Sequence, residues 1–236
     1  MGLFDTILGR TKPIRANLDA LFALPAAAVT LQVSAGVVPT GRAGVCFKPP
    51  AGQPFAQMQA ELEQLLATPD EPDDTAATAG PAGPAGSNTT PPAADSAVVR
   101  HVGDKYGYRW ILVEATAIDD VVTRVHMVHS SLQDAGWSTQ LLCSVFGFAP
   151  GPAADGTSVE AQTGAPAVSD PDAPPITEPV YLVYLAKQGT FYPFVPRANE
   201  QRDTELEMRL KSVVAGDLPV EPDLSRWFPI WDLPLA

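Results

Sequence analysis

The stretch from Tyr106 to Phe148 constrains the fold most, because it predicts a strand, a helix and a second strand in succession. Residues 107–114 are rich in aromatic and β-branched side chains, in a run short enough for one strand. The next segment carries apolar residues on one helical face, and Gly136 supplies a left-handed residue that ends the helix. That face consists of Ile118, Val121, Val122, Val125, Val128 and Leu132. The chain returns as a strand over residues 139–148, and no catalytic signature lies on this unit.

Further helices and strands are predicted on both sides of this central unit. Pro25 opens one of the helices, and Asn199 is the predicted N-cap of the last one. The expected helices cover 18–23, 26–33, 54–66 and 200–215, and the expected strands cover 41–48, 98–103, 180–187 and 190–195. Short turns between strands imply mostly antiparallel pairing. We therefore expect an α+β fold, with helices packed on one twisted, mostly antiparallel sheet.

Two acidic tracts rich in proline, alanine and glycine interrupt this pattern, at residues 69–97 and 149–178. They lack the apolar side chains that offset the entropy cost of ordering, so we predict two disordered insertions in a single domain over 17–236. The tracts hold ten of the 27 acids and no lysine or arginine. The rest of the chain has 17 acids against 15 bases, so the formal charge of −12 belongs mostly to the tracts. No basic surface is indicated, and binding to nucleic acid is not expected.

The first 16 residues form an N-terminal amphipathic segment. Its apolar stripe and basic flank are made by Leu3, Phe4, Ile7, Leu8, Arg10 and Lys12. One interpretation is a short helix docked on the domain, and the other is a helix that binds an anionic membrane surface weakly. The segment lacks the apolar core of a signal peptide, and the weakly polar run at 18–38 is interpreted as core helices. We expect a cytoplasmic protein, peripheral at the inner face of the membrane.

The C-terminus is dense in large apolar side chains, including Trp227, Phe228 and Trp231. In one interpretation this segment packs over the sheet as an irregular tail. In the other it is an exposed patch that binds a partner protein, because tryptophans often anchor interfaces. The three residues are therefore candidate partner-binding residues.

Catalytic and metal-binding patterns are weak throughout the chain. His126 and His129 have a spacing that can place two imidazoles on one metal ion, but His129 falls in the apolar helix stripe and is predicted to be a core residue. Cys46 and Cys143 lie in apolar strands and are expected to be buried, reduced thiols. There is no phosphate-binding glycine loop, nucleophile elbow or dinucleotide fingerprint. No metal or cofactor is expected, and a non-enzymatic role is favoured over a ligand sensor or an enzyme with a pocket on the sheet.

Four stretches together resemble one protein family. They are the opening MGLFDTILGRTK, the segment LDALFALP from Leu18, the segment PTGRAGVCF from Pro39, and the segment AGWSTQLLC from Ala135. The chain is similar to the phage-shock-protein-A-associated protein B (PspAB) family. This resemblance implies an accessory factor of the bacterial envelope-stress response, with the coiled-coil phage shock protein A as its partner. It carries no catalytic or binding residues over to this chain.

Overall fold

The computed structural model describes residues 18–49, 99–151 and 175–235, and the structural statements that follow concern these residues. Six strands form one sheet in the spatial order β2-β3-β1-β4-β5-β6, and every neighbouring pair is antiparallel. These strands are β1 (Val37–Phe47), β2 (Val99–Gly103), β3 (Arg109–Glu114), β4 (Leu141–Pro150), β5 (Val180–Leu185) and β6 (Thr190–Phe194). A separate two-residue ladder joins β7 (Pro196–Arg197) to β8 (Gln201–Arg202). The predicted α+β fold with an antiparallel sheet is confirmed.

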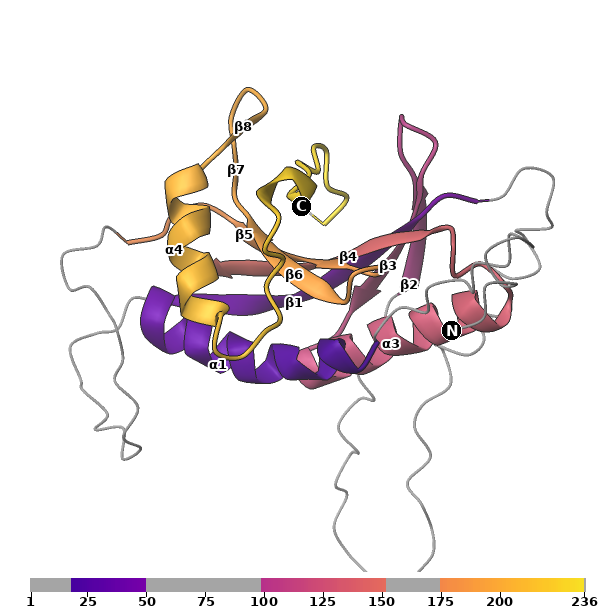
Figure 1. Cartoon of the computed structure of the whole chain (residues 1–236), viewed down its shortest axis with the longest axis horizontal. Helices are drawn as coiled ribbons and strands as arrows, with labels where there is room; N and C mark the ends of the chain where they lie inside the picture. The colour runs from indigo at the N-terminus through magenta and orange to yellow at the C-terminus, as the bar shows by residue number, and fades with distance from the viewer. Residues whose placement is uncertain (1–17, 50–98, 152–174, 236) are drawn as a thin grey trace, which may run out of the picture.

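The helices lie mainly on one side of the sheet (Figure 1). They are the 3₁₀ helix η1 (Leu18–Ala23), α1 (Leu24–Ala35), α3 (Ile118–Asp134), α4 (Thr204–Val214) and the short 3₁₀ helix η2 (Leu224–Arg226). α1 and α3 run beneath the sheet, and α4 contacts both α1 and the edge strand β6. The C-terminal segment after α4 crosses the opposite face of the sheet, so the sheet is covered from both sides.

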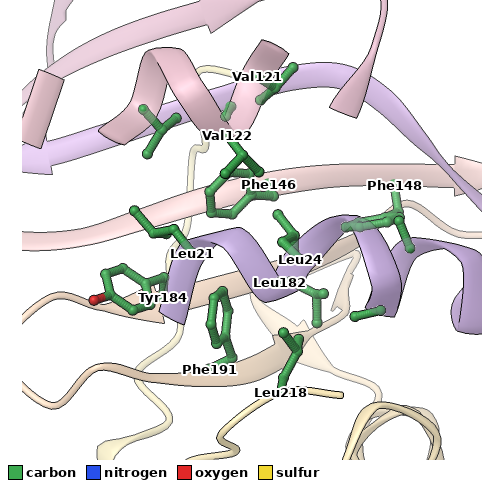
Figure 2. Close-up of a cluster of buried hydrophobic side chains, with 14 of the residues drawn as sticks. Leu21, Leu24, Val121, Val122, Phe146, Phe148, Leu182, Tyr184, Phe191 and Leu218 are labelled. Carbon is green, nitrogen blue, oxygen red and sulfur yellow. The ribbon is translucent and has the colours of Figure 1, made fainter. Parts of the chain in front are cut away.

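The main core fills the space between the helices and the sheet, as Figure 2 shows. Leu21 and Leu24 from η1 and α1 meet Phe146 and Phe148 from β4 there. Each of these side chains is at most 1% exposed. Burying one large apolar side chain contributes about 1.5–3 kcal/mol of stability. The many side chains of this layer therefore provide much of the free energy that holds the helices on the sheet.

The helices of the N-terminal half follow the predicted pattern closely. α3 covers Ile118–Asp134, and Gly136 takes a left-handed φ of 81° just after it. α1 has a proline in its first turn, and Gly36 closes it with a left-handed φ of 66°. Glycine adopts this conformation without the steric cost that a Cβ brings, and for that reason it ends helices so often.

The start of α4 differs from the prediction. Asn199 is not its N-cap, because Asn199 and Glu200 both have positive φ in the turn between β7 and β8. Asp203 caps the helix instead, and its carboxylate accepts a hydrogen bond of 2.9 Å from the backbone N–H of Leu206. Aspartate is as good a cap as asparagine, so sequence alone offers two candidates four residues apart.

The limits of the second acidic tract also need correction. β4 extends to Pro150, and Ile176 is 7% exposed in the main core, so both ends of the predicted tract 149–178 are ordered. The predicted helix at 54–66, the tract 69–97 and the N-terminal segment 1–16 lie outside the described residues.

Candidate functional site

An exposed apolar seam runs along η1 and α1, on the side that faces away from the sheet. We define this α1 seam as Phe22, Ala26, Val29 and Val33. Val29 and Val33 are 62% and 63% exposed. The inner face of the same helix buries Leu24 and Leu31 completely, so α1 is apolar on both sides. An apolar face that the fold does not bury is characteristic of an interaction surface.

The spacing of the α1 seam matches that of a helix that packs against another helix. Its members are separated by four, three and four residues, as in the a and d positions of a coiled coil. Asp19 is the one charged residue of Leu18–Ala35. Among the described residues, this is also the one helical run that is long and apolar enough to cross a membrane. That criterion is weak, because the core helix of a soluble protein satisfies it as well.

The C-terminal segment is held on the sheet by its aromatic side chains. Trp227 stacks on Tyr192 of β6 with a centroid separation of 5.6 Å, and it is 5% exposed. Trp231 packs edge-on against Phe194 at 5.5 Å. The Tyr192 hydroxyl donates a hydrogen bond of 2.8 Å to the backbone carbonyl of Phe228, and burial raises the pKa of this tyrosine well above its usual value. These contacts fix the segment as a second layer.

A cavity of about 570 Å³ lies between the sheet and this segment. From the sheet it is lined by Cys46, Trp110, Leu142, Cys143, Leu185 and Tyr192, and residues 228–231 form its outer wall. Asp104 stands at the rim, and one of its carboxylate oxygens accepts hydrogen bonds from the backbone N–H groups of Tyr106 and Tyr108. Its other oxygen accepts from the indole of Trp110 at 3.2 Å. The acid nearest the cavity is therefore engaged in holding the β2–β3 turn.

A buried ion pair anchors α4 beside the C-terminal segment. Both carboxylate oxygens of Glu207, a side chain 1% exposed, accept hydrogen bonds from the guanidinium of Arg202 at 3.0 and 2.9 Å. One of them also accepts from the backbone N–H of Val195 at 2.9 Å. Arg202 further donates to the carbonyl of Trp227. One guanidinium thus connects β8, α4 and the C-terminal segment.

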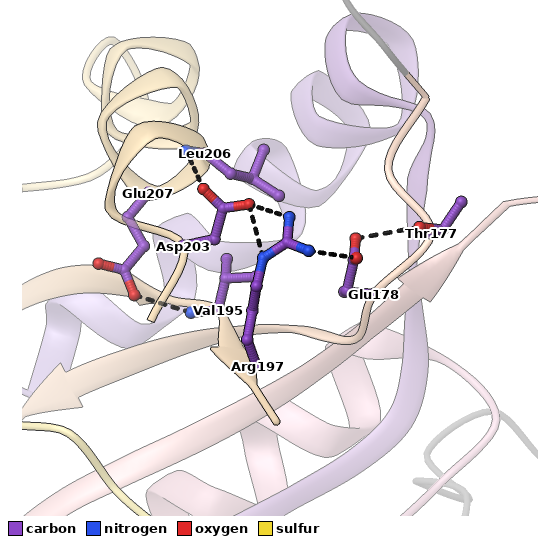
Figure 3. Close-up of polar contacts among 7 residues, drawn as sticks. All are labelled: Thr177, Glu178, Val195, Arg197, Asp203, Leu206 and Glu207. Carbon is purple, nitrogen blue, oxygen red and sulfur yellow. Dashed lines mark hydrogen bonds and ion pairs between the residues drawn. The ribbon is translucent and has the colours of Figure 1, made fainter. Parts of the chain in front are cut away.

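A second arginine network lies on the surface near Glu207, as Figure 3 shows. Arg197 donates to Glu178 at 2.8 Å and to Asp203 at 3.0 Å, and its side chain is 46% exposed. The guanidinium and then the N–H of Leu206 lower the pKa of the Asp203 carboxyl. The network fixes the helix cap and offers no unoccupied acid that could act as a catalytic base.

The three candidate partner-binding residues differ in how much of each side chain is exposed. Trp227 is buried against Tyr192 of the sheet, and Trp231 is half-buried at the cavity wall. Phe228 is 60% exposed, so it alone of the three offers most of its surface to a partner. The candidate membrane-surface residues, Leu3, Phe4, Ile7, Leu8, Arg10 and Lys12, lie outside the described residues.

His129 is a core residue, as its place in the helix stripe predicts. It is completely buried, and its Nε2 lies 2.6 Å from the hydroxyl of Ser144. Burial, and secondarily the charge of His126, lowers the pKa of His129 to about 3, so the imidazole is neutral at physiological pH. In the described part of the chain, no group of three histidine, cysteine or acidic side chains is placed to hold a metal ion.

Two features were not anticipated from the sequence. The α1 seam was interpreted as core helix, because an all-round apolar helix gives no sign of which face is exposed. The second is that Cys46 and Cys143 face each other across β1 and β4. Their positions within apolar strands were clear, but pairing between distant strands is not encoded in local pattern.

The fold and surfaces together define an α+β protein with an exposed helical seam and an aromatic second layer on its sheet. The chain belongs to the PspAB family, described as PspA associated protein B, whose pattern matches residues 1–235. It is thus a protein associated with the phage-shock system. No curated protein and no solved structure matches it.

Proposed function

We propose that this protein is a non-enzymatic adaptor of the membrane-stress response, which binds a phage-shock-protein-A-type partner through the α1 seam. The observation that carries the proposal is the row of four exposed apolar residues with coiled-coil spacing, three of them on α1 and Phe22 on the preceding 3₁₀ helix η1, while the other face of α1 is packed on the core. The resemblance assigns the partner a helical coiled coil, and a helix is the element that such a seam accommodates. The family's association with PspA supports this choice of partner.

The alternative of a ligand sensor or enzyme has less support. Such a site needs several polar groups that converge on one point of a pocket. Apart from Asp104, Lys187, Gln188 and the two cysteines, the cavity on the sheet is lined by aromatic, aliphatic and proline side chains. The carboxylate of Asp104 already accepts three hydrogen bonds, two from the β2–β3 turn and one from Trp110 of β3. An adaptor requires only the exposed apolar surface.

A charge placed in the α1 seam should weaken partner binding without unfolding the domain. Val29→Lys would place an ammonium group where the valine is expected to be buried by the partner. Since burying a valine contributes about 1.5–3 kcal/mol, affinity should fall by about tenfold or more. The measurement is calorimetric titration of the full chain with the phage-shock-protein-A-type protein of the same cell.

The matched control is Thr139→Lys, which adds the same charge at an exposed loop residue between α3 and β4. Its affinity should stay within about twofold of wild type. Both variants should have nearly the same melting temperature as wild type. Equal affinity of Val29→Lys and wild type would contradict the α1 seam as the interface. Loss of affinity in both variants would point to a general charge effect instead.

The N-terminal segment is proposed to place the adaptor at the inner face of the membrane. Its basic residues contribute about 1 kcal/mol each near anionic lipid, and its apolar stripe adds to this. In flotation with anionic liposomes, Phe4→Asp should lose binding. Thr6→Asp, which makes the same charge change away from the apolar stripe of the predicted helix, should retain much of it. If wild type does not float with anionic liposomes, the segment is not a membrane anchor.

A further inference from the structure

Cys46 and Cys143 are directly opposite residues of two antiparallel strands. Opposite residues in such a pair have Cα atoms about 4.5 or 5.5 Å apart and side chains on the same face. Both separations fall within the range of about 4.4–6.8 Å found between the Cα atoms of disulfide-bonded cysteines. The two residues are the only cysteines of the chain, and both are free thiols in the structure. The sheet therefore places the two thiols of the protein next to each other.

The surroundings of this pair differ from those of an inert core thiol. Both cysteines line the cavity under the C-terminal segment, so a small uncharged molecule that enters the cavity meets both sulfur atoms. The register of β1 and β4 shifts directly after this pair, between Cys46 and Phe47, and Phe47 then pairs with Leu141. The extra residue of β4 at this irregularity is Leu142, which also lines the cavity. Irregular ladders bend more readily than regular ones, which favours a small approach of the two strands.

Both cysteines are free thiols, and Cys46 is protonated at physiological pH. A hydrogen bond with Cys143, and then burial, raises the pKa of the Cys46 thiol. Thiolate is the nucleophilic form, and a raised pKa lowers the thiolate fraction. The site should therefore react slowly at a low oxidant concentration, and appreciably only when the oxidant concentration rises.

We propose that Cys46 and Cys143 form a dithiol modification site that closes to an intramolecular disulfide on reaction with hydroperoxides. One thiolate attacks the distal oxygen of ROOH, which gives a sulfenic acid and releases ROH after the alkoxide takes up the thiol proton. The second thiol then attacks the sulfenic sulfur, and water leaves with the hydroxyl. In total, one hydroperoxide and two thiols react to give one disulfide, one alcohol and one water molecule. The apolar lining of the cavity suits a hydroperoxide with an alkyl group.

The test is oxidation of the folded full-length protein with tert-butyl hydroperoxide, followed by denaturation and labelling with a maleimide polymer. Wild type should pass from doubly labelled to unlabelled protein, remain a monomer on a non-reducing gel, and regain both labels after reduction. Peptide mass spectrometry should find the two cysteine peptides joined, with the loss of two hydrogen atoms. Phenylarsine oxide, which bridges paired thiols, should block both labels at once without any oxidant.

The control keeps two thiols on the same face but moves one of them along β4. The double variant Cys143→Ser, Val145→Cys places the second thiol opposite Gly44, diagonal to Cys46. It should form little intramolecular disulfide and react little with phenylarsine oxide. Equal cross-linking in this variant, sulfinic acids on both wild-type cysteines, or disulfide-linked dimers in place of the internal bond would each overturn the proposal. A wild type that cross-links only in denaturant would overturn it as well.

Discussion

Replacement of Val125 by aspartate is expected to unfold the domain. Val125 is completely buried in the main core, between α3 and the sheet. Aspartate would leave a carboxylate there with no cationic partner, at a cost of several kcal/mol. Since total stability is about 5–15 kcal/mol, this is a large part of the margin. Chemical denaturation should show a midpoint near zero denaturant or no folded baseline.

The control for this change is Thr123→Asp, at an exposed position of the same helix. The new acid lies four residues after Asp119, so a penalty of about 0.2–0.5 kcal/mol is expected from repulsion. Met127, which the helix phase places on the outer face, is in fact partly buried against the core and does not serve as a control. Equal midpoints for the two aspartate variants would contradict the packing of α3.

The second large effect is expected from Arg202→Met. The change leaves the Glu207 carboxylate buried, with the N–H of Val195 as its remaining hydrogen-bond donor among the contacts described. Removing one partner of a buried ion pair costs about 3–5 kcal/mol, because the other charge stays uncompensated. The release of Trp227 from its contact with Arg202 adds to this loss. The measurement is the free energy of unfolding from denaturant titration.

Arg197→Met is the matched control, since it removes the same group from the exposed network beside it. Exposed ion pairs contribute about 0–1 kcal/mol, so this variant should lose little. Adding Glu207→Gln to Arg202→Met should recover part of the stability, because the neutral amide still accepts from Val195. If Arg197→Met lowers the free energy of unfolding as much as Arg202→Met does, then burial does not decide how much these ion pairs contribute to stability.

The fold was predictable where local pattern and tertiary packing agree. α3 runs over Ile118–Asp134 as its 3.6-residue apolar period predicts, and five of its periodic apolar residues are fully buried. The strand expected at 190–195 is also present as β6, and its Pro193 lacks the N–H that an inner strand needs, which agrees with the place of β6 at the edge of the sheet.

The functional surfaces were not predictable in the same way. The residues of the α1 seam and its buried side are equally apolar, so only the position of the sheet decides which valines are exposed. Likewise, the opposition of Cys46 and Cys143 depends on the register of β1 against β4, which includes two shifts. Long-range register depends on the burial of a whole face, not on the residues next to each cysteine.

The most direct test of the adaptor role is a photo-cross-linking residue at position 29 of the full-length protein in living cells under envelope stress. If the α1 seam binds this partner, the phage-shock-protein-A-type protein should be cross-linked from position 29 and not from position 139. The same residue at position 228 tests the exposed phenylalanine of the C-terminal segment as the competing surface. A cross-link to that partner from 228 but not from 29, or cross-links from 29 to lipid only, would contradict the α1 seam as the interface of the adaptor.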